Sequence, residues 1–401
     1  MQDNEKKPAL RFKDFTDPWE QRKLGEVFEE YSEKNHAELP PLTIIQGGGT
    51  IRRDESERAL QYDKSSLSNY KMVNKDDFIV HLRSFEGGLE KASSQGIISP
   101  AYHTFHGEDV DSRFYYAYFR SKNFINKDLK PHVYGIRDGR SIDIEGMKTI
   151  RIPWASYPEQ KSIGDFLTHL DILITLHQRK YEKLVNIKKS MLDKMFPQNG
   201  ASVPEIRFKG FTDPWEQRKL GEIAKEVVRN DPASDAPIMM ITAGNGFIEQ
   251  SDRYAFNNAG ESLKKYILLE CGELAYNHGA SKLRPYGSCF ALTTVEKARI
   301  PFVYHCFSVE KCNPEFLSIE LNGANVENQL RKIVSSGARM DGLLNIAYSE
   351  YTEVTVQLPK KEEQDWIAKF FKHLDTLITL HQRKLEKLQN IKKSCLEKMF
   401  V

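Results

Sequence analysis

The sequence predicts an α+β protein in which two mixed α/β domains are joined by two long antiparallel coiled-coil helices, with an internal pseudo-two-fold repeat. Three observations lead to this prediction: two sequence blocks that each occur twice, diverged sequence between them, and a heptad-like apolar pattern in each half. The length of 401 residues accommodates two or three domains of ordinary size.

The repeat has two parts. The block at 11–27 recurs at 207–223 with 15 of 17 positions identical, and the block at 166–196 recurs at 370–400 with 24 of 31 identical. The shifts are 196 and 204 residues, so the intervening segment is eight residues longer in the second half. Because only the intervening segments have diverged, we expect two domains that bind different targets, and repeated parts that bind one kind of partner twice or each other.

The repeated blocks also set the domain boundaries. A first globular domain, a first long helix, a linker, a second globular domain and a second long helix are predicted at 1–150, 151–196, 197–206, 207–356 and 357–401. Strands are expected in the first domain at 77–82, 97–98, 114–119 and 149–152. Strands are expected in the second domain at 238–241, 266–269, 290–293, 303–309 and 354–358. Gly47-Gly48-Gly49 is expected at a hairpin tip.

The long helices are predicted from apolar residues three and four positions apart, which form one stripe along a helix. A helix of roughly 37 residues is about 55 Å long and cannot bury such a stripe alone. We therefore expect the two helices to pair in antiparallel orientation. The predicted helix–helix contacts are Leu170, Ile174, His177, Tyr181 and Leu184 in the first helix and Leu374, Ile378, His381, Leu385 and Leu388 in the second.

Two histidines occupy matching positions near the helix middles, and antiparallel pairing brings His177 close to His381. Such a pair serves either as a pH-sensitive or metal-binding contact or as a hydrogen-bonded part of the interface. The hydrogen-bonded use is the commoner one, so no metal site is predicted.

Charge is unevenly distributed. The chain has 58 Lys and Arg against 56 Asp and Glu, a net charge of +2, but the two copies of the second block together carry +7 and the remainder −5. A basic helix face is suited to DNA phosphates or to an acidic partner. It is equally common on solvated helices, so charge alone does not decide the function.

Several classes of protein are excluded by composition. The sequence has no run of eighteen apolar residues and no apolar signal segment. We therefore expect no membrane-spanning segment and a cytoplasmic location. The five cysteines form no CxxC pair, and the spacings of 18, 17 and 6 among the first four match no standard zinc pattern. Gly47-Gly48-Gly49 lacks the lysine of a phosphate-binding P-loop. Asn-Pro-Glu-Phe at 313–316 is superficially similar to a motif of amino-methyltransferases, but no glycine-rich cofactor motif precedes it, so we interpret it as a turn. No catalytic centre is expected.

Aromatic and basic residues alternate around the expected loops of both domains. Arg, Asn and His side chains donate hydrogen bonds to base edges, and Lys and Arg bind phosphates. The candidate DNA-binding residues are Arg83, Ser84, Tyr102, His103, Arg137 and Arg140 in the first domain and Asn277, His278, Lys282, Arg284 and Arg339 in the second. Arg137 and Arg339 are favoured because each lies in a Gly-x-Arg sequence before an Asp-Gly turn.

The repeated order of motifs resembles the specificity subunit of type I restriction-modification systems. Phe-Thr-Asp-Pro-Trp-Glu-Gln-Arg-Lys-Leu-Gly-Glu occurs twice, and each copy is followed by a variable domain, a proline, a Glu-Gln pair and a long Leu/Lys-rich helix. The resemblance extends from Pro8 to Phe400. The segments at 70–73, 76–78 and 96–102 also resemble the family's target-recognition domains, whereas the second domain departs from the last of them at 287–290.

The resemblance implies a non-catalytic subunit in which each target-recognition domain reads one half of a bipartite, asymmetric site in double-stranded DNA. The paired helices would set the gap and dock two methyltransferase subunits, and restriction/translocase subunits would join for cleavage. S-adenosylmethionine, ATP and Mg would be bound by those partners, and no cofactor is expected in this chain. The alternative is a coiled-coil scaffold that binds proteins and no DNA; a standalone methyltransferase is disfavoured because no cofactor motif is present.

Overall fold

The chain is described by a computed structural model over residues 7–56, 64–81, 88–134, 141–198, 200–253, 260–334 and 344–400. It divides into two compact units. Unit 1 comprises 1–179 together with 381–401, and unit 2 comprises 180–380. Each unit therefore contains one globular part and a stretch of both long helices, so the units differ from the continuous domains expected from the sequence.

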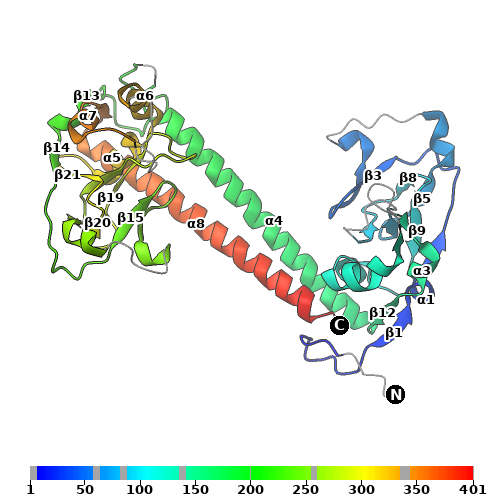
Figure 1. Cartoon of the computed structure of the whole chain (residues 1–401). Helices are drawn as coiled ribbons and strands as arrows, with labels where there is room; N and C mark the ends of the chain where they lie inside the picture. The colour runs from blue at the N-terminus through cyan, green and yellow to red at the C-terminus, as the bar shows by residue number, and fades with distance from the viewer. Residues whose placement is uncertain are drawn as a thin grey trace. The chain divides into compact units, whose positions relative to one another are not determined.

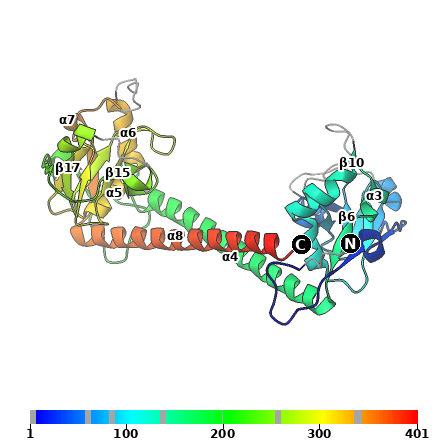
Figure 2. The ribbon, with the colours of Figure 1, turned by 60° about the horizontal axis from the view of Figure 1, so that its bottom comes forward.

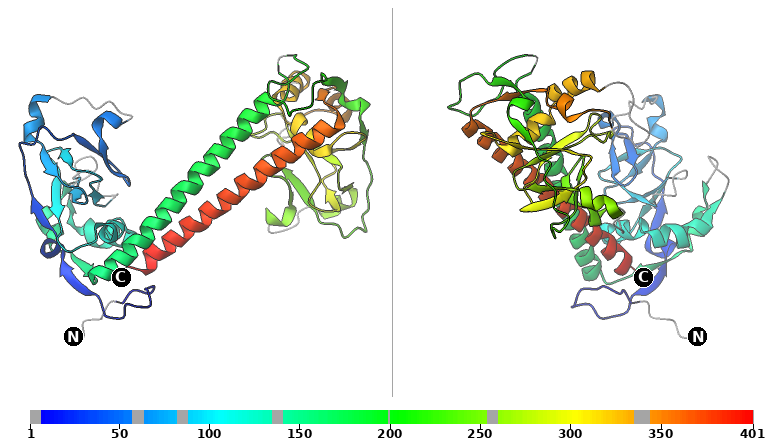
Figure 3. Two further views of the ribbon diagram at one scale, coloured as in Figure 1. Left: turned by 180° about the vertical axis from the view of Figure 1, so that it is seen from behind. Right: turned by 60° about the vertical axis from the view of Figure 1, so that its left-hand side comes forward.

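Two helices of 38 residues dominate the fold, α4 (Tyr157–Lys194) and α8 (Lys361–Lys398). They lie side by side and run in opposite directions (Figures 1 and 3). Proline occurs only in the first turn of α4 and nowhere in α8, so the helical hydrogen bonds continue without a break. The predicted antiparallel pairing of two long helices is confirmed.

The globular part of unit 1 is built on a four-stranded antiparallel sheet in the order β2-β9-β6-β7. Three further two-stranded antiparallel pairs, β3 with β4, β5 with β8 and β10 with β11, and a strand pair at the start of α4 (β1 with β12) complete it. Its elements are β1 (Glu20–Lys23), α1 (Leu24–Val27), β2 (Glu29–Tyr31), β3 (Leu42–Ile45), β4 (Gly49–Arg52), β5 (Lys71–Val73), β6 (Phe78–Val80), β7 (Glu90–Lys91), β8 (Gly96–Ile98), β9 (His103–His106), α2 (Ser112–Phe119), β10 (Val133–Tyr134), β11 (Ser141–Ile142), α3 (Ile144–Lys148) and β12 (Arg151–Trp154).

Unit 2 repeats this plan with a sheet in the order β14-β21-β18-β19 and a strand pair, β13 with β22, at the start of α8. Its elements are β13 (Glu216–Lys219), β14 (Ala224–Glu226), β15 (Met239–Thr242), β16 (Gly246–Glu249), β17 (Ile267–Glu270), β18 (Leu274–Asn277), β19 (Ser288–Ala291), β20 (Lys297–Ile300), β21 (His305–Val309), α5 (Pro314–Leu321), α6 (Ala324–Ile333), α7 (Tyr348–Tyr351) and β22 (Thr355–Leu358).

One predicted strand is wrong. Residues 114–119 form most of α2 instead, because Asp111 at the N-cap accepts hydrogen bonds from the backbone N–H groups of Arg113 and Phe114. The helix buries four of its aromatic side chains in the unit 1 core. The other expected strands overlap observed ones, and Gly47 and Gly48 form the expected turn between β3 and β4.

Each unit has an aromatic core that receives the C-terminal end of a long helix. In unit 1, Phe400 packs against Trp19 and Phe114, with ring centroids 6.5 and 5.2 Å away. The C-terminal end of α8 and the first unit's globular part can be followed in Figure 2. In unit 2, Phe196 packs against Trp215 at 5.8 Å. The repeated Lys-Met-Phe endings therefore fill equivalent positions in the two units.

Candidate functional site

The register of the two sheets brings the candidate loops to equivalent places. In unit 1, Val80 of β6 pairs with His103 of β9, and in unit 2, Tyr276 of β18 pairs with His305 of β21. The connection that follows β6 and the one that follows β18 consequently leave corresponding ends of the two sheets. The candidate DNA-binding residues that the structure describes lie at the end of β18, on the connection that follows it, or at the start of β9. We call each such place the reading end of its unit.

At the reading end of unit 1, Tyr102 lies beside His81, with ring centroids 4.8 Å apart. The backbone carbonyl of Tyr102 accepts a hydrogen bond from Lys71 Nζ at 2.6 Å, and partial burial lowers the pKa of Lys71. His103 Nδ1 lies 2.5 Å from Glu30 Oε1. These contacts tie the start of β9 to two neighbouring strands and fix the direction of the Tyr102 ring.

At the reading end of unit 2, Asn277 and His278 are held by the backbone around them. Asn277 Nδ2 donates to the carbonyl of Ile241 at 3.0 Å, and its Oδ1 accepts from Gly279 N at 2.9 Å. The buried ring of His278 has Nδ1 2.8 Å from the carbonyl of Leu344 and Nε2 2.7 Å from that of Val303. Both side chains are thus occupied in shaping the connection.

The two other candidates in unit 2, Lys282 and Arg284, differ in exposure. Arg284 Nη1 donates to the carbonyl of Asn322 at 2.6 Å, and burial lowers the pKa of this guanidinium. Lys282 is exposed, and Leu283 beside it is 64% exposed. Leu283 was not predicted from the sequence, because an apolar residue in a loop carries no signal until its exposure is known.

Five candidate DNA-binding residues cannot be placed. Arg83, Ser84, Arg137, Arg140 and Arg339 lie outside the described residues.

The Glu-Gln pair at the start of α4 connects the helix to the rest of unit 1. Glu159, whose side chain is 1% exposed, forms two hydrogen bonds with Arg11, at 2.6 and 2.7 Å, and accepts a third from Trp19 Nε1 at 3.0 Å. Gln160 Oε1 accepts from the backbone N–H of Asp111, the N-cap of α2, at 2.9 Å. The helix direction is therefore fixed relative to the first repeated block and to α2.

The same arrangement recurs at the start of α8. Arg207 binds Glu363 through two hydrogen bonds of 2.7 Å, and Gln364 Oε1 accepts from the backbone N–H of Asn313 at 2.8 Å. One difference is that buried Trp215 Nε1 has no hydrogen-bond partner among the described residues. The sequence motif that led to the resemblance is thus the attachment of each long helix to its unit.

Within each unit the two long helices are held by residues that correspond in the repeat. In unit 1, Lys392 of α8 forms an ion pair with Asp171 of α4, and in unit 2, Lys188 of α4 forms the corresponding pair with Asp375 of α8 at 2.5 Å. His177 Nδ1 and His381 Nδ1 lie 2.8 Å apart. These contacts define an antiparallel register that is symmetric about the two histidines.

None of the remaining predicted helix contacts is exposed. Leu170 and Leu388 belong to the apolar core of unit 1, and Leu184 and Leu374 to that of unit 2. The others are half-buried: Ile174, Tyr181, Ile378 and Leu385.

Several apolar side chains on the helices point away from this interface. On α4, Ile172, Leu173 and Leu176 are 58%, 42% and 44% exposed. On α8, Leu380, which corresponds to Leu176 in the repeat, is also 44% exposed. Apolar groups that lie together on a helix surface commonly mark a protein-binding surface. The first repeated helix presents three such side chains here, and the second presents Leu380 at the position that corresponds to Leu176.

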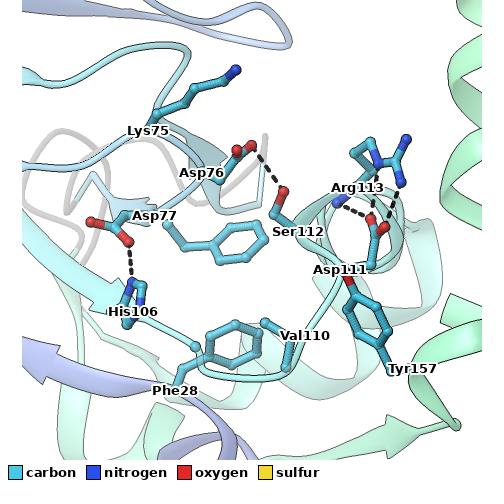
Figure 4. A pocket seen from close by; sticks show the side chains of 12 residues that line it. Phe28, Lys75, Asp76, Asp77, His106, Val110, Asp111, Ser112, Arg113 and Tyr157 are labelled. Atoms are coloured by element: carbon cyan, nitrogen blue, oxygen red, sulfur yellow. Dashed lines mark hydrogen bonds and ion pairs between the residues drawn. The ribbon is translucent and has the colours of Figure 1, made fainter. Parts of the chain in front are cut away.

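A cavity of about 260 Å³ lies in unit 1 between the sheet and α2 (Figure 4). Three of its carboxylates already accept hydrogen bonds: Asp77 from His106 Nδ1 at 2.6 Å, Asp76 from Ser112 Oγ at 2.9 Å, and Asp111 from Arg113 Nη2 at 2.5 Å. In unit 2 the sheet register places Gly272 and Ser308 where unit 1 has Asp76 and His106. The residues at these positions therefore differ between the two units, and the acids of the unit 1 cavity are occupied by structural contacts.

Among the described residues, no group of three or more His, Cys, Asp or Glu side chains is arranged to hold a metal ion. The thiols of Cys289 and Cys306 are buried, and burial raises the pKa of both. In the same part of the chain no helix is both long and apolar enough to cross a membrane.

Known proteins with similar sequence agree with this architecture. Residues 16–186 match the type I restriction modification DNA specificity domain. A protein of Methanocaldococcus jannaschii named "Putative type I restriction enzyme MjaX specificity subunit" is 22% identical over 411 residues, which cover 94% of this chain and 91% of that protein. Both comparisons therefore show that the chain is similar to type I restriction-modification specificity subunits, over residues 16–186 in one case and over 94% of the chain in the other.

A solved structure supports the fold. The crystal structure of the type I restriction-modification S subunit from M. genitalium matches with a TM-score of 0.59 at 13% sequence identity, covering 99% of both chains. The mixed helix-and-strand architecture of this chain, with its two long paired helices, is therefore similar to the fold of an experimentally determined structure.

Proposed function

We propose that this chain is the DNA-reading subunit of a type I restriction-modification complex, and that each unit reads one half of a bipartite, asymmetric DNA site. The observation that carries the proposal is the contrast between diverged reading ends and nearly identical attachments. Tyr102 and His103 in unit 1 correspond to Tyr304 and His305 in unit 2, but the connections after β6 and β18 differ in sequence. Two different loops on one scaffold suit two different half-sites.

The reading ends suggest separate roles for the candidate residues. Lys282 and Leu283 are exposed and free to contact a phosphate or a base edge, and apolar side chains contact the methyl group of thymine. Asn277, His278 and Arg284 bind carbonyls of their own unit, so we assign them to supporting the loop. Arg83, Ser84, Arg137, Arg140 and Arg339 remain candidates for direct contact.

The helices are assigned two tasks in this proposal. Their antiparallel pairing sets the gap between the half-sites, and the exposed apolar residues of the repeated blocks dock two methyltransferase subunits. Leu176 on α4 and Leu380 on α8 correspond in the repeat and are both exposed, which supports docking at repeated surfaces. The chain itself is non-catalytic, and restriction/translocase subunits join the complex for cleavage. S-adenosylmethionine, ATP and Mg belong to those partners, in the cytoplasm.

A domain exchange tests the proposal. Residues 28–150 are replaced by the corresponding segment of another family member, and the DNA methylated by the assembled complex is sequenced. We expect one half of the methylated site to change while the other half and the gap stay the same. Changes in both halves would contradict independent reading by the two units.

The alternative is a scaffold that binds proteins and no DNA. Affinity for DNA, measured in the presence of the methyltransferase partner at several salt concentrations, distinguishes the two. DNA binding that weakens steeply with salt is expected, because phosphate contacts release counterions. Absence of DNA binding by the assembled complex would favour the scaffold.

A further inference from the structure

Two imidazole nitrogens from different helices face each other in unit 1. His177 Nδ1 of α4 lies 2.8 Å from His381 Nδ1 of α8, with ring centroids 5.0 Å apart and ring planes inclined by 44°. Both side chains are half-buried, so solvent reaches them. We propose that these two nitrogens bind a late transition-metal ion of the Cu²⁺ or Ni²⁺ kind, which then links α4 to α8.

The separation of the nitrogens decides which ions suit the site. Imidazole nitrogen binds such ions at about 2.0–2.1 Å. Two nitrogens 2.8 Å apart at that distance subtend an angle of about 86° at the ion. This is close to the right angle between neighbouring ligands in square-planar or octahedral coordination, whereas a tetrahedral ion needs nitrogens about 3.3 Å apart. The separation of the metal-free pair is thus close to that of neighbouring ligands around Cu²⁺ or Ni²⁺, and the rings adjust it when they turn toward an ion.

Binding requires a lone pair on both Nδ1 atoms. In the hydrogen-bonded pair one ring carries its proton on Nδ1. When the ion binds, that ring changes to its Nε2–H tautomer, so each Nδ1 donates an electron pair to the metal and no net proton is lost. Each ring also turns about its Cβ–Cγ bond, which directs the lone pair from the opposite nitrogen toward the ion. Water fills the remaining coordination positions.

The surroundings select against other cations. Mg²⁺ and Ca²⁺ prefer oxygen ligands. The residues two and three positions after each histidine are cationic and exposed: Arg179, Lys180, Arg383 and Lys384. Positive charge opposes the approach of any metal ion, and only a strong bond to imidazole overcomes it. Affinity for nitrogen ligands increases along the first-row series to Cu²⁺, which agrees with the geometric argument.

The consequence is a metal-dependent link between the two repeats. An ion that binds only the paired helices stabilises the pairing by mass action. Each repeat contributes one histidine to a single pair, so the chain has one such site and binds one ion there.

The test is titration of the full chain with NiCl₂, in a Cys271→Ser background because Cys271 is an exposed thiol. Calorimetry gives the number of ions and the affinity, and electron paramagnetic resonance with Cu²⁺ gives the number of bound nitrogens. The test variants are His177→Gln and His381→Gln. The matched controls are His169→Gln and His373→Gln, which replace exposed histidines of the same helices at positions that also correspond in the repeat. Circular dichroism without metal checks that each variant folds.

We expect one ion per chain, two nitrogens in the Cu²⁺ spectrum, and a melting temperature that rises with Ni²⁺. Either test variant should weaken binding about tenfold or more and abolish the rise, whereas the controls should bind like the parent chain. Equal binding by the double variant His177→Gln/His381→Gln, or equal loss in the controls, would overturn the proposal and indicate adventitious binding. A Cu²⁺ spectrum with a single nitrogen would overturn it as well.

Discussion

Neighbouring side chains in one loop can have different roles in DNA binding. Lys282 is exposed, whereas Arg284 is partly buried and donates to the carbonyl of Asn322. A side chain whose donors are used inside the protein supports the loop, and one that extends into solvent can reach a phosphate.

For Lys282→Ala we expect weaker DNA binding by the assembled complex. The slope of the logarithm of affinity against the logarithm of salt concentration should decrease by roughly 0.9, because one phosphate contact and the counterion that it releases are lost. The measurement is affinity against salt concentration on the methylated sequence. The control is Lys297→Ala, which removes another exposed lysine of unit 2, in β20, where it pairs with Glu270. An equal effect in both variants would argue against a specific contact at Lys282.

A buried carboxyl in unit 2 gives a pH prediction. Burial raises the pKa of Glu320 to about 7, and the backbone N–H of Gln357 donates to its Oε1 at 3.0 Å. The folded state binds this proton more tightly than the unfolded state, whose ordinary value is 4.5. The stabilisation is therefore complete below about pH 4.5 and is lost as the pH rises through about 7, in total on the order of 3 kcal/mol.

The corresponding measurement is the unfolding of unit 2 in urea at pH 5 and pH 8 for the parent chain and Glu320→Gln. The neutral amide removes this titration, so the loss of stability between the two pH values should be smaller in the variant. Glu362→Gln, at an exposed position of α8, should behave as the parent does. An unchanged pH dependence in Glu320→Gln would show that the carboxyl is not the responsible group.

At the scale of elements, the ion pairs between the long helices set orientation more than stability. An exposed ion pair stabilises the folded chain by about 0.2–1 kcal/mol. In another register of the helices, like charges would face each other, and their repulsion would increase the free-energy difference between the two registers. Asp171 with Lys392 and Lys188 with Asp375 occur at corresponding positions of the repeat. Both pairs form in one antiparallel register.

Charge reversal tests this role. Lys188→Glu places two carboxylates together beside Asp375, and we expect the melting temperature of unit 2 to fall; the double variant Lys188→Glu/Asp375→Lys should recover most of the loss. Scanning calorimetry at low salt gives the coupling energy of the pair. Additive effects of the two substitutions would mean that the pair contributes nothing.

The sequence predicted the elements that depend on long patterns. The stripe of apolar residues predicted α4, α8 and their pairing, because positions three and four apart share one face only when the chain is helical. The strand expected at 114–119 was wrong because Phe-Tyr-Tyr-Ala-Tyr-Phe favours strand by composition. The cap at Asp111 and the burial of Phe114, Tyr115, Tyr118 and Phe119, which share one helix face, favour a helix instead. The role of Asn277 and His278 was not predictable either, since their partners Ile241 and Leu344 lie far away in sequence.

At the scale of the whole molecule, the proposed gap-setting role of the helices gives a prediction. Insertion of seven residues after Lys180 and after Lys384 adds two helical turns to each helix, about 10 Å. This corresponds to about three base pairs of DNA at 3.4 Å each. Sequencing of methylated DNA should show a longer gap and unchanged half-sites. An unchanged gap would refute the idea that the helices measure it.

The attachment of each long helix has a consequence for inheritance. Arg11 with Glu159 and Arg207 with Glu363 make the same contacts around two unlike domains. Genetic recombination within the repeated blocks would therefore replace one domain while keeping the arginine–glutamate contact that attaches the long helix. A cell could then acquire a new DNA specificity in one step, because the part that changes and the part that must stay constant are encoded in separate stretches of the gene.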